Sequence, residues 1–193
     1  MFTGLVETVG KIKRSVYFNG GKSFRIQTFS AFVPQVSESI AINGVCFTVT
    51  KLIKDTEFEV FASSETLSKT NFHLSQAMQA VNIERALKLN DRIGGHLVQG
   101  HVEDIGRIVT KKIKTDMTTL TVKVSPNLSK YIVKNGNISV EGVSLTVIDT
   151  KNNTFEIGLI PFTLKNTTLG NLHTGSLVNI ETDIIGKYIN NEK

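Results

Sequence analysis

The chain has 193 residues, 40% hydrophobic and 20% charged, with three prolines, a composition typical of a globular protein and unlike a disordered or fibrous one. No apolar run reaches the roughly 18 residues of a membrane span, and the start lacks the features of a signal peptide, so we expect a cytoplasmic protein without a membrane partner. The net charge is +5, but the basic residues are scattered, which does not favour nucleic acid as a partner.

Short strands are predicted along the whole chain. The runs 24–28 and 120–124 alternate with a period of two, and Gly, Asn, Asp or Ser interrupts such runs about every 8 to 12 residues. Short helices are predicted at Thr66 to Asn71, at Pro126 to Lys134 and at the C-terminus. Short antiparallel strands in a small domain tend to close into a barrel, because closure removes exposed edges. The predicted fold class is therefore all-β, with small barrels in tandem.

The second half of the chain repeats the first. Segment 43–49, Asn-Gly-Val-Cys-Phe-Thr-Val, returns as 141–147, Glu-Gly-Val-Ser-Leu-Thr-Val, at a shift of 141 − 43 = 98 residues. Val-Asn-Ile-Glu at 81–84 returns at 178–181, shifted by 97. Blocks that keep their order and offset indicate a duplicated domain. The predicted units are an N-terminal barrel over 1–96, a C-terminal barrel over 97–185 and a tail or helix over 186–193.

One strand of each copy has a small polar face. In 45–50 the odd-numbered residues are apolar, and the even-numbered ones are Cys46 and two threonines; 143–147 repeats the pattern with Ser144 and Thr146. Successive side chains of a strand point to opposite faces, and small polar groups suit the lining of a ligand pocket. A solvent-facing strand is the alternative, but the repetition favours a pocket in each copy. Cys46 is the only cysteine, which excludes an internal disulfide.

Two histidines flank a glycine-rich stretch, Gly-Gly-His-Leu-Val-Gln-Gly-His at 94–101. It is not a phosphate-binding loop, because the Gly-Lys-Ser ending is missing. His96 and His101 could transfer protons near neutral pH. No further ligand stands at a suitable spacing, so no metal site is predicted. A purely structural role for both histidines is an equally good interpretation.

Together these motifs resemble riboflavin synthase over nearly the whole chain. The similarity is carried by segments 1–7, 43–50, 84–86, 94–102, 141–147, 159–161 and 167–170. The resemblance implies two Greek-key barrels and a dismutation, in which two molecules of 6,7-dimethyl-8-ribityllumazine exchange a four-carbon unit to give riboflavin and 5-amino-6-(ribitylamino)uracil. It implies no metal or cofactor, a homotrimer and a possible association with lumazine synthase.

The resemblance also implies two substrate pockets, which we call the Cys46 site and the Ser144 site. The Cys46 site would contain Cys46, Phe47, Thr48, Phe61, Ala62, Ser63, Ser64, Glu65, Thr66, Gly100, His101 and Val102. The Ser144 site would contain Gly4, Leu5, Val6, Asn135, Ser144, Leu145, Thr146, Gly158, Leu159, Ile160, Pro161, Phe162 and Thr163. The residues assigned to catalysis are Cys46, His101, Ser144, Thr146 and Asp183.

These assignments follow from the chemistry that the resemblance implies. The 7-methyl group of one lumazine must lose a proton, and the resulting carbanion attacks the other molecule. A base or activated water near His101, Ser144 and Thr146 would serve the first step, with Cys46 as nucleophile or hydrogen-bonding group. The chain departs from the family pattern at Phe162, where a polar residue is usual, and at Asn135, where a lysine is usual.

Two other classes of protein remain possible on the sequence. One is a lumazine or flavin carrier without enzymatic activity, which would share the duplicated barrels. The other is an oligonucleotide-binding barrel, which suits the sequence pI of about 9.3 but requires aromatic and basic residues interleaved on the binding strands. Most of the 11 phenylalanines fall instead on positions predicted to face the core.

Overall fold

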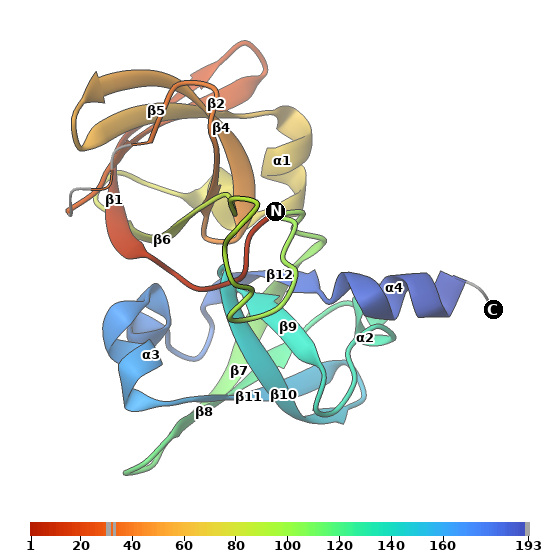
Figure 1. Cartoon of the computed structure of the whole chain (residues 1–193). Coiled ribbons are helices and arrows are strands. Elements are labelled where there is room, and N and C mark those ends of the chain that lie inside the picture. Colours follow the sequence, from red (N-terminus) through yellow and green to blue (C-terminus); the bar gives the residue numbers. More distant parts are fainter. Residues whose placement is uncertain (30–31, 33, 192–193) are drawn as a thin grey trace.

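The computed structural model describes residues 1–29, 32 and 34–191, and these form twelve strands in two closed antiparallel barrels (Figure 1). The first barrel consists of β1 (Thr8–Phe18), β2 (Gly21–Gln27), β3 (Ser39–Ile42), β4 (Val45–Lys54), β5 (Glu57–Ala62) and β6 (Ala80–Arg85). The second consists of β7 (Asp104–Ile113), β8 (Thr118–Lys123), β9 (Asn137–Val140), β10 (Val143–Lys151), β11 (Thr154–Leu159) and β12 (Leu177–Thr182). The predicted all-β tandem of barrels is confirmed, whereas the exact domain boundaries stay predictions.

The two barrels have the same topology. Around the first the order is β1-β2-β5-β4-β3-β6, and around the second it is β7-β8-β11-β10-β9-β12. In each barrel the chain returns after the third and fourth strands, so that the fifth strand pairs with the second; this is a Greek-key connection. The register of β1 shifts between Ile12 and Arg14, and that of β7 shifts between Ile108 and Thr110, 96 residues later. Shared irregularities of this kind support the duplication inferred from the sequence.

Short helices cover parts of both barrels. They are α1 (Ser64–Lys69), the 3₁₀ turn η1 (Asn71–Leu74), α2 (Pro126–Ser129), α3 (Pro161–Asn166), the 3₁₀ turn η2 (Thr168–Asn171) and α4 (Ile184–Asn191). No helix among the described residues is long and apolar enough to cross a membrane.

The observed helices differ from the predicted ones in two places. The helix predicted at Pro126 to Lys134 ends at Ser129, because the amides of Tyr131 and Ile132 bond three residues back, in turns rather than in an α-helix. Helix α3 was not predicted; it is the counterpart of α1 and starts with Pro161, whose fixed φ suits a first helical turn. The predicted helices at 66–71 and at the C-terminus correspond to α1 with η1 and to α4.

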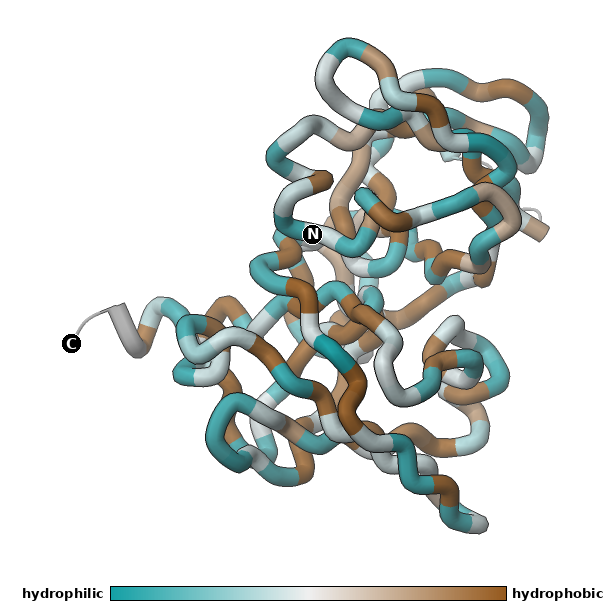
Figure 2. Tube along the Cα trace, turned by 180° about the vertical axis from the view of Figure 1, so that it is seen from behind, coloured by the Kyte–Doolittle hydropathy of each residue, from teal (hydrophilic) through white to brown (hydrophobic). Residues whose placement is uncertain are grey.

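Each barrel has its own core, closed by the 3₁₀ turn. Phe72 of η1 is fully buried, and its ring packs edge-on against Phe24 and Phe47 with centroids 5.3 and 5.1 Å apart. Leu169 of η2, shifted by 97 residues, is fully buried in the second core. Figure 2 shows hydrophobic and hydrophilic residues alternating along the barrel strands, as the period of two predicts.

The two barrels meet at equivalent turns. Asn43 and Gly44 of the first turn, like Glu141 and Gly142 of the second, have positive φ angles. The turns touch directly: a Cβ atom on Gly44 would lie 2.6 Å from the amide nitrogen of Gly142, and the reverse distance is also 2.6 Å. Because no real Cβ tolerates such a distance, glycine is required at both positions.

Two asparagines of the repeated Val-Asn-Ile-Glu motif bind these turns reciprocally. The side-chain amide of Asn82 donates to the backbone carbonyl of Glu141 in the other barrel (2.8 Å). The side-chain amide of Asn179 donates to the backbone carbonyl of Asn43 (3.0 Å). Their Oδ1 atoms accept from the backbone amides of Thr168 and Asn71, both at 2.8 Å. The interface is therefore an approximate twofold arrangement of buried polar groups, in which both asparagine side chains have partners for donor and acceptor.

Glu141 is the one position of these two turns with an ionisable side chain. Its Oε1 accepts from the backbone N–H of Asn179 (2.6 Å) and from the side-chain amide of Asn71 (2.9 Å). At the equivalent position, Asn43 Oδ1 accepts from the backbone N–H of Asn82 (2.7 Å). Burial raises the pKa of Glu141 from 4.5 to about 8, and the hydrogen bonds only partly oppose this effect. The carboxyl group is therefore protonated at neutral pH in the folded protein.

We predict that Glu141→Gln removes a pH dependence of stability. Between pH 4.5 and about 8 the folded chain keeps a proton that the unfolded chain releases, so stability falls as pH rises through this window, by at most about 1.4 kcal/mol per pH unit. Urea unfolding at pH 5.5, 7 and 8.5 should show a smaller decline for Glu141→Gln than for the parent. Asp116→Asn, at an exposed position, is the control and should follow the parent. An equal decline in Glu141→Gln would contradict the prediction.

Candidate functional site

The segments that precede the two barrels each cross to the other barrel. Gly4, ahead of β1, accepts a hydrogen bond through its carbonyl from the Ser144 amide on β10 (2.8 Å). Gly100, ahead of β7, accepts in the same way from the Cys46 amide on β4 (2.9 Å). The segments also pair with each other, through two hydrogen bonds between Phe2 and Val98 at 2.7 and 3.0 Å. Each polar strand face is therefore completed by a segment that belongs to the other copy.

Close packing explains the glycines of these segments. Gly4 and Gly100 have φ angles of +74° and +80°. A Cβ atom on Gly4 would lie 2.7 Å from the Cβ of Ser144, and one on Gly100 would lie 2.6 Å from the Cβ of Cys46. The repeated glycine thus serves both the backbone conformation and the approach to the polar strand.

Two buried carboxylates hold the crossing segments. Glu84, at the end of the first Val-Asn-Ile-Glu motif, accepts from the backbone amides of Thr3 (2.6 Å) and Gly4 (3.0 Å). Glu181 accepts from the amides of Gln99 (2.6 Å) and Gly100 (2.9 Å). Burial raises the pKa of both carboxyl groups, although these hydrogen bonds act in the opposite direction. The sequence marked this motif as a repeat but did not reveal its role.

A cavity of about 360 Å³ opens beside Cys46, in the size range of pockets for small molecules. It is bounded by β4, by α1 and by the crossing segment. Its lining residues are Val45, Cys46, Glu65, Thr66, Lys69, Thr70, Gly100, His101 and Val102. The structure therefore brings together six of the residues predicted for the Cys46 site. Lys69, which forms an ion pair with Glu65 at 2.8 Å, was not predicted.

The other residues predicted for the Cys46 site are not among the residues that line this cavity. Phe47 and Ala62 are buried in the first core, and Thr48 and Phe61 are exposed on β4 and β5. Ser63 caps α1 by accepting from the Thr66 amide at 3.1 Å, and Ser64 is the first residue of that helix.

The Cys46 thiol is neutral in this environment. Burial raises its pKa, and a hydrogen bond with Ser39, on the neighbouring strand β3, opposes this effect only in part. A thiol without its negative charge is a weak nucleophile. Of the two roles considered for Cys46, the raised pKa of its thiol therefore favours hydrogen bonding over nucleophilic attack. Ser39 was not predicted as part of the site.

The Ser144 site has a histidine that the Cys46 site lacks. His96 Nδ1 lies 2.7 Å from Ser144 Oγ, and His96 is only 6% exposed. Burial lowers the pKa of His96, while the nearby charge of Asp183 acts in the opposite direction. Gly95 permits this approach, since a Cβ there would lie 2.2 Å from the Thr3 carbonyl oxygen and 2.9 Å from Ser144 Oγ.

Thr146 and Asp183 belong to the same region. Thr146 on β10 stands opposite Asn137 on β9, and the Asn137 side-chain amide donates to Asp183 Oδ2 at 3.0 Å. The other Asp183 oxygen accepts from the Ile185 amide (3.1 Å) at the start of α4. The catalytic assignments thus fall into two groups: Cys46 with His101 in one site, and Ser144, Thr146 and Asp183 in the other.

The remaining residues predicted for the Ser144 site are more scattered. Gly4 packs closely on Ser144. Val6 and Leu145 are partly buried and each packs against the second core, in which Leu159 is fully buried. Leu5, Asn135, Ile160, Pro161 and Phe162 are exposed, and Gly158 and Thr163 are half-buried. Phe162, where a polar residue is usual in the family, is 72% exposed at the start of α3.

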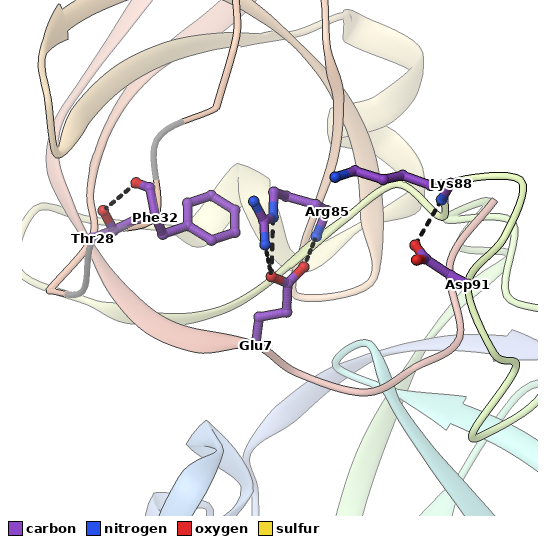
Figure 3. A network of polar contacts seen from close by, with 6 residues as sticks. All are labelled: Glu7, Thr28, Phe32, Arg85, Lys88 and Asp91. Carbon is purple, nitrogen blue, oxygen red and sulfur yellow. Dashed lines mark hydrogen bonds and ion pairs between the residues drawn. The ribbon is translucent and has the colours of Figure 1, made fainter.

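A second, polar cavity of about 400 Å³ lies next to Thr3 and Leu5 and was not predicted. Glu7 and Arg85 both line it. Glu7 accepts hydrogen bonds from Arg85 Nη2 (2.7 Å), Arg85 Nε (3.0 Å) and the Arg85 backbone amide (2.7 Å). Figure 3 shows this pair beside Phe32, whose ring lies 5.0 Å from the guanidinium carbon. The described part of the chain contains no group of three His, Cys, Asp or Glu residues that could hold a metal ion.

We predict that Gly100→Ala disrupts the Cys46 site, with Gly20→Ala as a matched control. Both glycines have φ near +80°, but nothing lies within 4 Å of a Cβ on Gly20. Gly20→Ala should lose about 1 kcal/mol through backbone strain, and Gly100→Ala about 1 to 3 kcal/mol more through overpacking. Reaction of Cys46 with a thiol reagent should also be faster in Gly100→Ala. Equal stability and equal thiol reactivity in the two variants would refute the packing of Gly100 on Cys46.

Comparison with known proteins identifies the family. Residues 3–86 and 99–183 each match the lumazine binding domain. The riboflavin synthase of Actinobacillus pleuropneumoniae is 40% identical over 193 residues, which cover 98% of this chain and 88% of the relative. That of Bacillus subtilis is 37% identical over 190 residues, with the same coverages of 98% and 88%.

The fold is shared with a solved structure. The crystal structure of LumP complexed with 6,7-dimethyl-8-(1'-D-ribityl) lumazine has a TM-score of 0.85 and 22% identity, covering 94% of this chain and 99% of that one. Both halves thus match one domain, and the relatives match over most of their length. The chain belongs to the riboflavin synthase family and is an enzyme of that family.

Proposed function

We propose that the protein catalyses the dismutation of 6,7-dimethyl-8-ribityllumazine. One molecule donates a four-carbon unit and becomes 5-amino-6-(ribitylamino)uracil, and the other accepts the unit and becomes riboflavin. The observation that carries the proposal is the presence of two sites of common design, each a polar strand completed by a crossing segment. A reaction between two copies of one molecule needs two such sites, because holding both reactants makes their encounter effectively unimolecular.

The two sites are chemically unequal, which suits separate donor and acceptor roles. Cys46 corresponds to Ser144, and His101 corresponds to Leu5. His101 is exposed at the wall of the Cys46 cavity, where it can exchange protons with a ligand and with solvent. We assign His101 to proton transfer and the neutral Cys46 thiol to hydrogen bonding. Ser144, Thr146 and Asp183 bind and orient the second lumazine.

We further propose that the active assembly is a homotrimer held by α4. Lys187 anchors this helix to the second barrel through an ion pair with Glu103 at 3.0 Å, and Figure 1 shows the helix extending away from both barrels. Ile185, Tyr188 and Ile189 are 57%, 70% and 62% exposed on it. Apolar residues at this spacing share one helix face, which another copy of the helix can cover. The association with lumazine synthase stays a prediction from the resemblance.

A lumazine carrier is the alternative function. The LumP structures carry 6,7-dimethyl-8-(1'-D-ribityl) lumazine in one case and riboflavin in another, and their fold matches this chain with TM-scores of 0.85. A carrier needs the pockets but no proton transfer, so His101 is the residue whose role separates the two functions.

The proposed reaction predicts product without any added cofactor. Purified protein mixed with 6,7-dimethyl-8-ribityllumazine should form one riboflavin for every two lumazines consumed, measured by chromatography against a boiled control. Tight binding without product would favour the carrier, provided that sedimentation shows an assembled trimer. Absence of both binding and product would reject the proposed substrate.

We predict that His101→Ala lowers kcat by about 100-fold, the smaller end of the usual contribution of acid–base groups. His173→Ala is the matched control, because His173 bonds Ser176 within its own loop and lies outside both sites. Cys46→Ser should retain most of the activity, since serine keeps a neutral hydrogen-bonding group at this position. Unchanged turnover in His101→Ala would remove His101 from the mechanism.

A further inference from the structure

Only one of the two ring nitrogens of His96 has a hydrogen-bond partner among the described residues. Nδ1 is 2.7 Å from Ser144 Oγ, but Nε2 is buried and has no hydrogen-bond partner among the described residues. The side chain is 6% exposed, so neither nitrogen is freely solvated. Most buried polar atoms do have a partner, and an unpartnered one calls for a physical reason.

The position of the ring proton decides what Ser144 can do. Burial lowers the pKa of His96, so the ring is neutral at pH 7 and carries one proton. A proton on Nε2 would leave a buried N–H group without an acceptor, whereas a proton on Nδ1 leaves only an unused lone pair. Orphaned buried N–H groups are rarer than under-used acceptors. The lack of a partner for Nε2 therefore favours the tautomer in which Nδ1–H donates to Ser144 Oγ.

We infer that His96 is a positioning residue that holds Ser144 as a hydrogen-bond donor toward an oxygen or ring nitrogen of the ligand in the Ser144 site. Because Ser144 Oγ accepts from His96, its own proton is free for another partner. Ser144 is then not activated as a nucleophile, since Nδ1 already carries a proton and cannot take the one on Oγ. The ligand named here rests on the proposed function.

The backbone around Ser144 supports this role. The Ser144 amide is bound to the Gly4 carbonyl (2.8 Å), and Gly4 and Gly95 pack so closely on the residue that neither could carry a Cβ. Ser144 is nevertheless only half-buried, so the residue is not sealed inside the protein. The amide, the Cβ and one lone pair of Oγ are thus fixed by the protein, and the O–H group is the part left to the ligand.

The tautomer can be read directly by ¹⁵N NMR of the ligand-free full chain at pH 7. Comparison with His96→Asn assigns the His96 ring among the four histidines. We expect a neutral ring with a proton on Nδ1. A proton on Nε2, or a charged ring, would overturn the inference. Since this readout needs no ligand, it is independent of the proposed function: a protein that neither binds nor converts lumazine rejects that function alone.

Binding variants test the consequence for Ser144. Asparagine can place an N–H group near the position of Nδ1, so His96→Asn should rescue what His96→Phe loses. The probe is 6,7-dimethyl-8-ribityllumazine, and the Ser144 amide resonance reports occupancy of this site. We expect affinity to fall roughly five- to tenfold in His96→Phe and in Ser144→Ala, as for one lost hydrogen bond, with little loss in His96→Asn.

The double variant completes this test. His96→Phe combined with Ser144→Ala should bind no more weakly than Ser144→Ala alone, because both changes remove the same interaction. Thermal unfolding checks that all variants are folded. Additive losses, or equal losses in His96→Asn and His96→Phe, would mean that His96 only fills space and would overturn the inference.

Discussion

The contact between the turns at 43–44 and 141–142 is the constraint on which the other features depend. It is a contact of backbone on backbone, with no room for a Cβ on either glycine. Asn82 and Asn179 bind the facing turns reciprocally, so the barrels are fixed about an approximate twofold axis. In this arrangement the polar faces of β4 and β10 lie within reach of the segments that precede the opposite barrels. The architecture of both sites follows from that placement.

Buried polar groups maintain this arrangement. The two Val-Asn-Ile-Glu motifs supply an asparagine to the interface and a glutamate to a crossing segment, and each side chain is hydrogen-bonded to backbone groups. Leaving one such group unpaired costs about 1 to 3 kcal/mol, so a shifted barrel or a detached segment is disfavoured. Hydrophobic cores of the two barrels supply stability, but apolar packing alone would not specify the register of the crossing segments.

The sequence predicted what depends on local pattern and left open what depends on tertiary contact. Alternation in 45–50 and 143–147 correctly separated core-facing from polar residues, and the repeat correctly indicated two barrels. Helix α3 was missed: its six residues show no helical period, and the signal that could have indicated it was the repeat of Thr66-Leu67 of α1 as Thr163-Leu164. His96 remained ambiguous because its partner Ser144 is 48 residues away and no periodicity connects them. The available signal for Glu84 and Glu181 was a charged residue directly after a valine-asparagine-isoleucine run in both copies.

The duplicated frame is built mainly from backbone contacts, which explains how its two sites can differ chemically. Gly4 and Gly100 bind Ser144 and Cys46 through the same carbonyl-to-amide hydrogen bond, which is indifferent to the side chain at either strand position. Cysteine and serine can therefore occupy equivalent places without altering the fold. The interface behaves likewise, since Asn43 and Glu141 accept from equivalent amides with different side chains. Differences in chemistry between the sites must then reside where the repeat is broken, at Cys46 and His101 on one side and at His96 and Ser144 on the other.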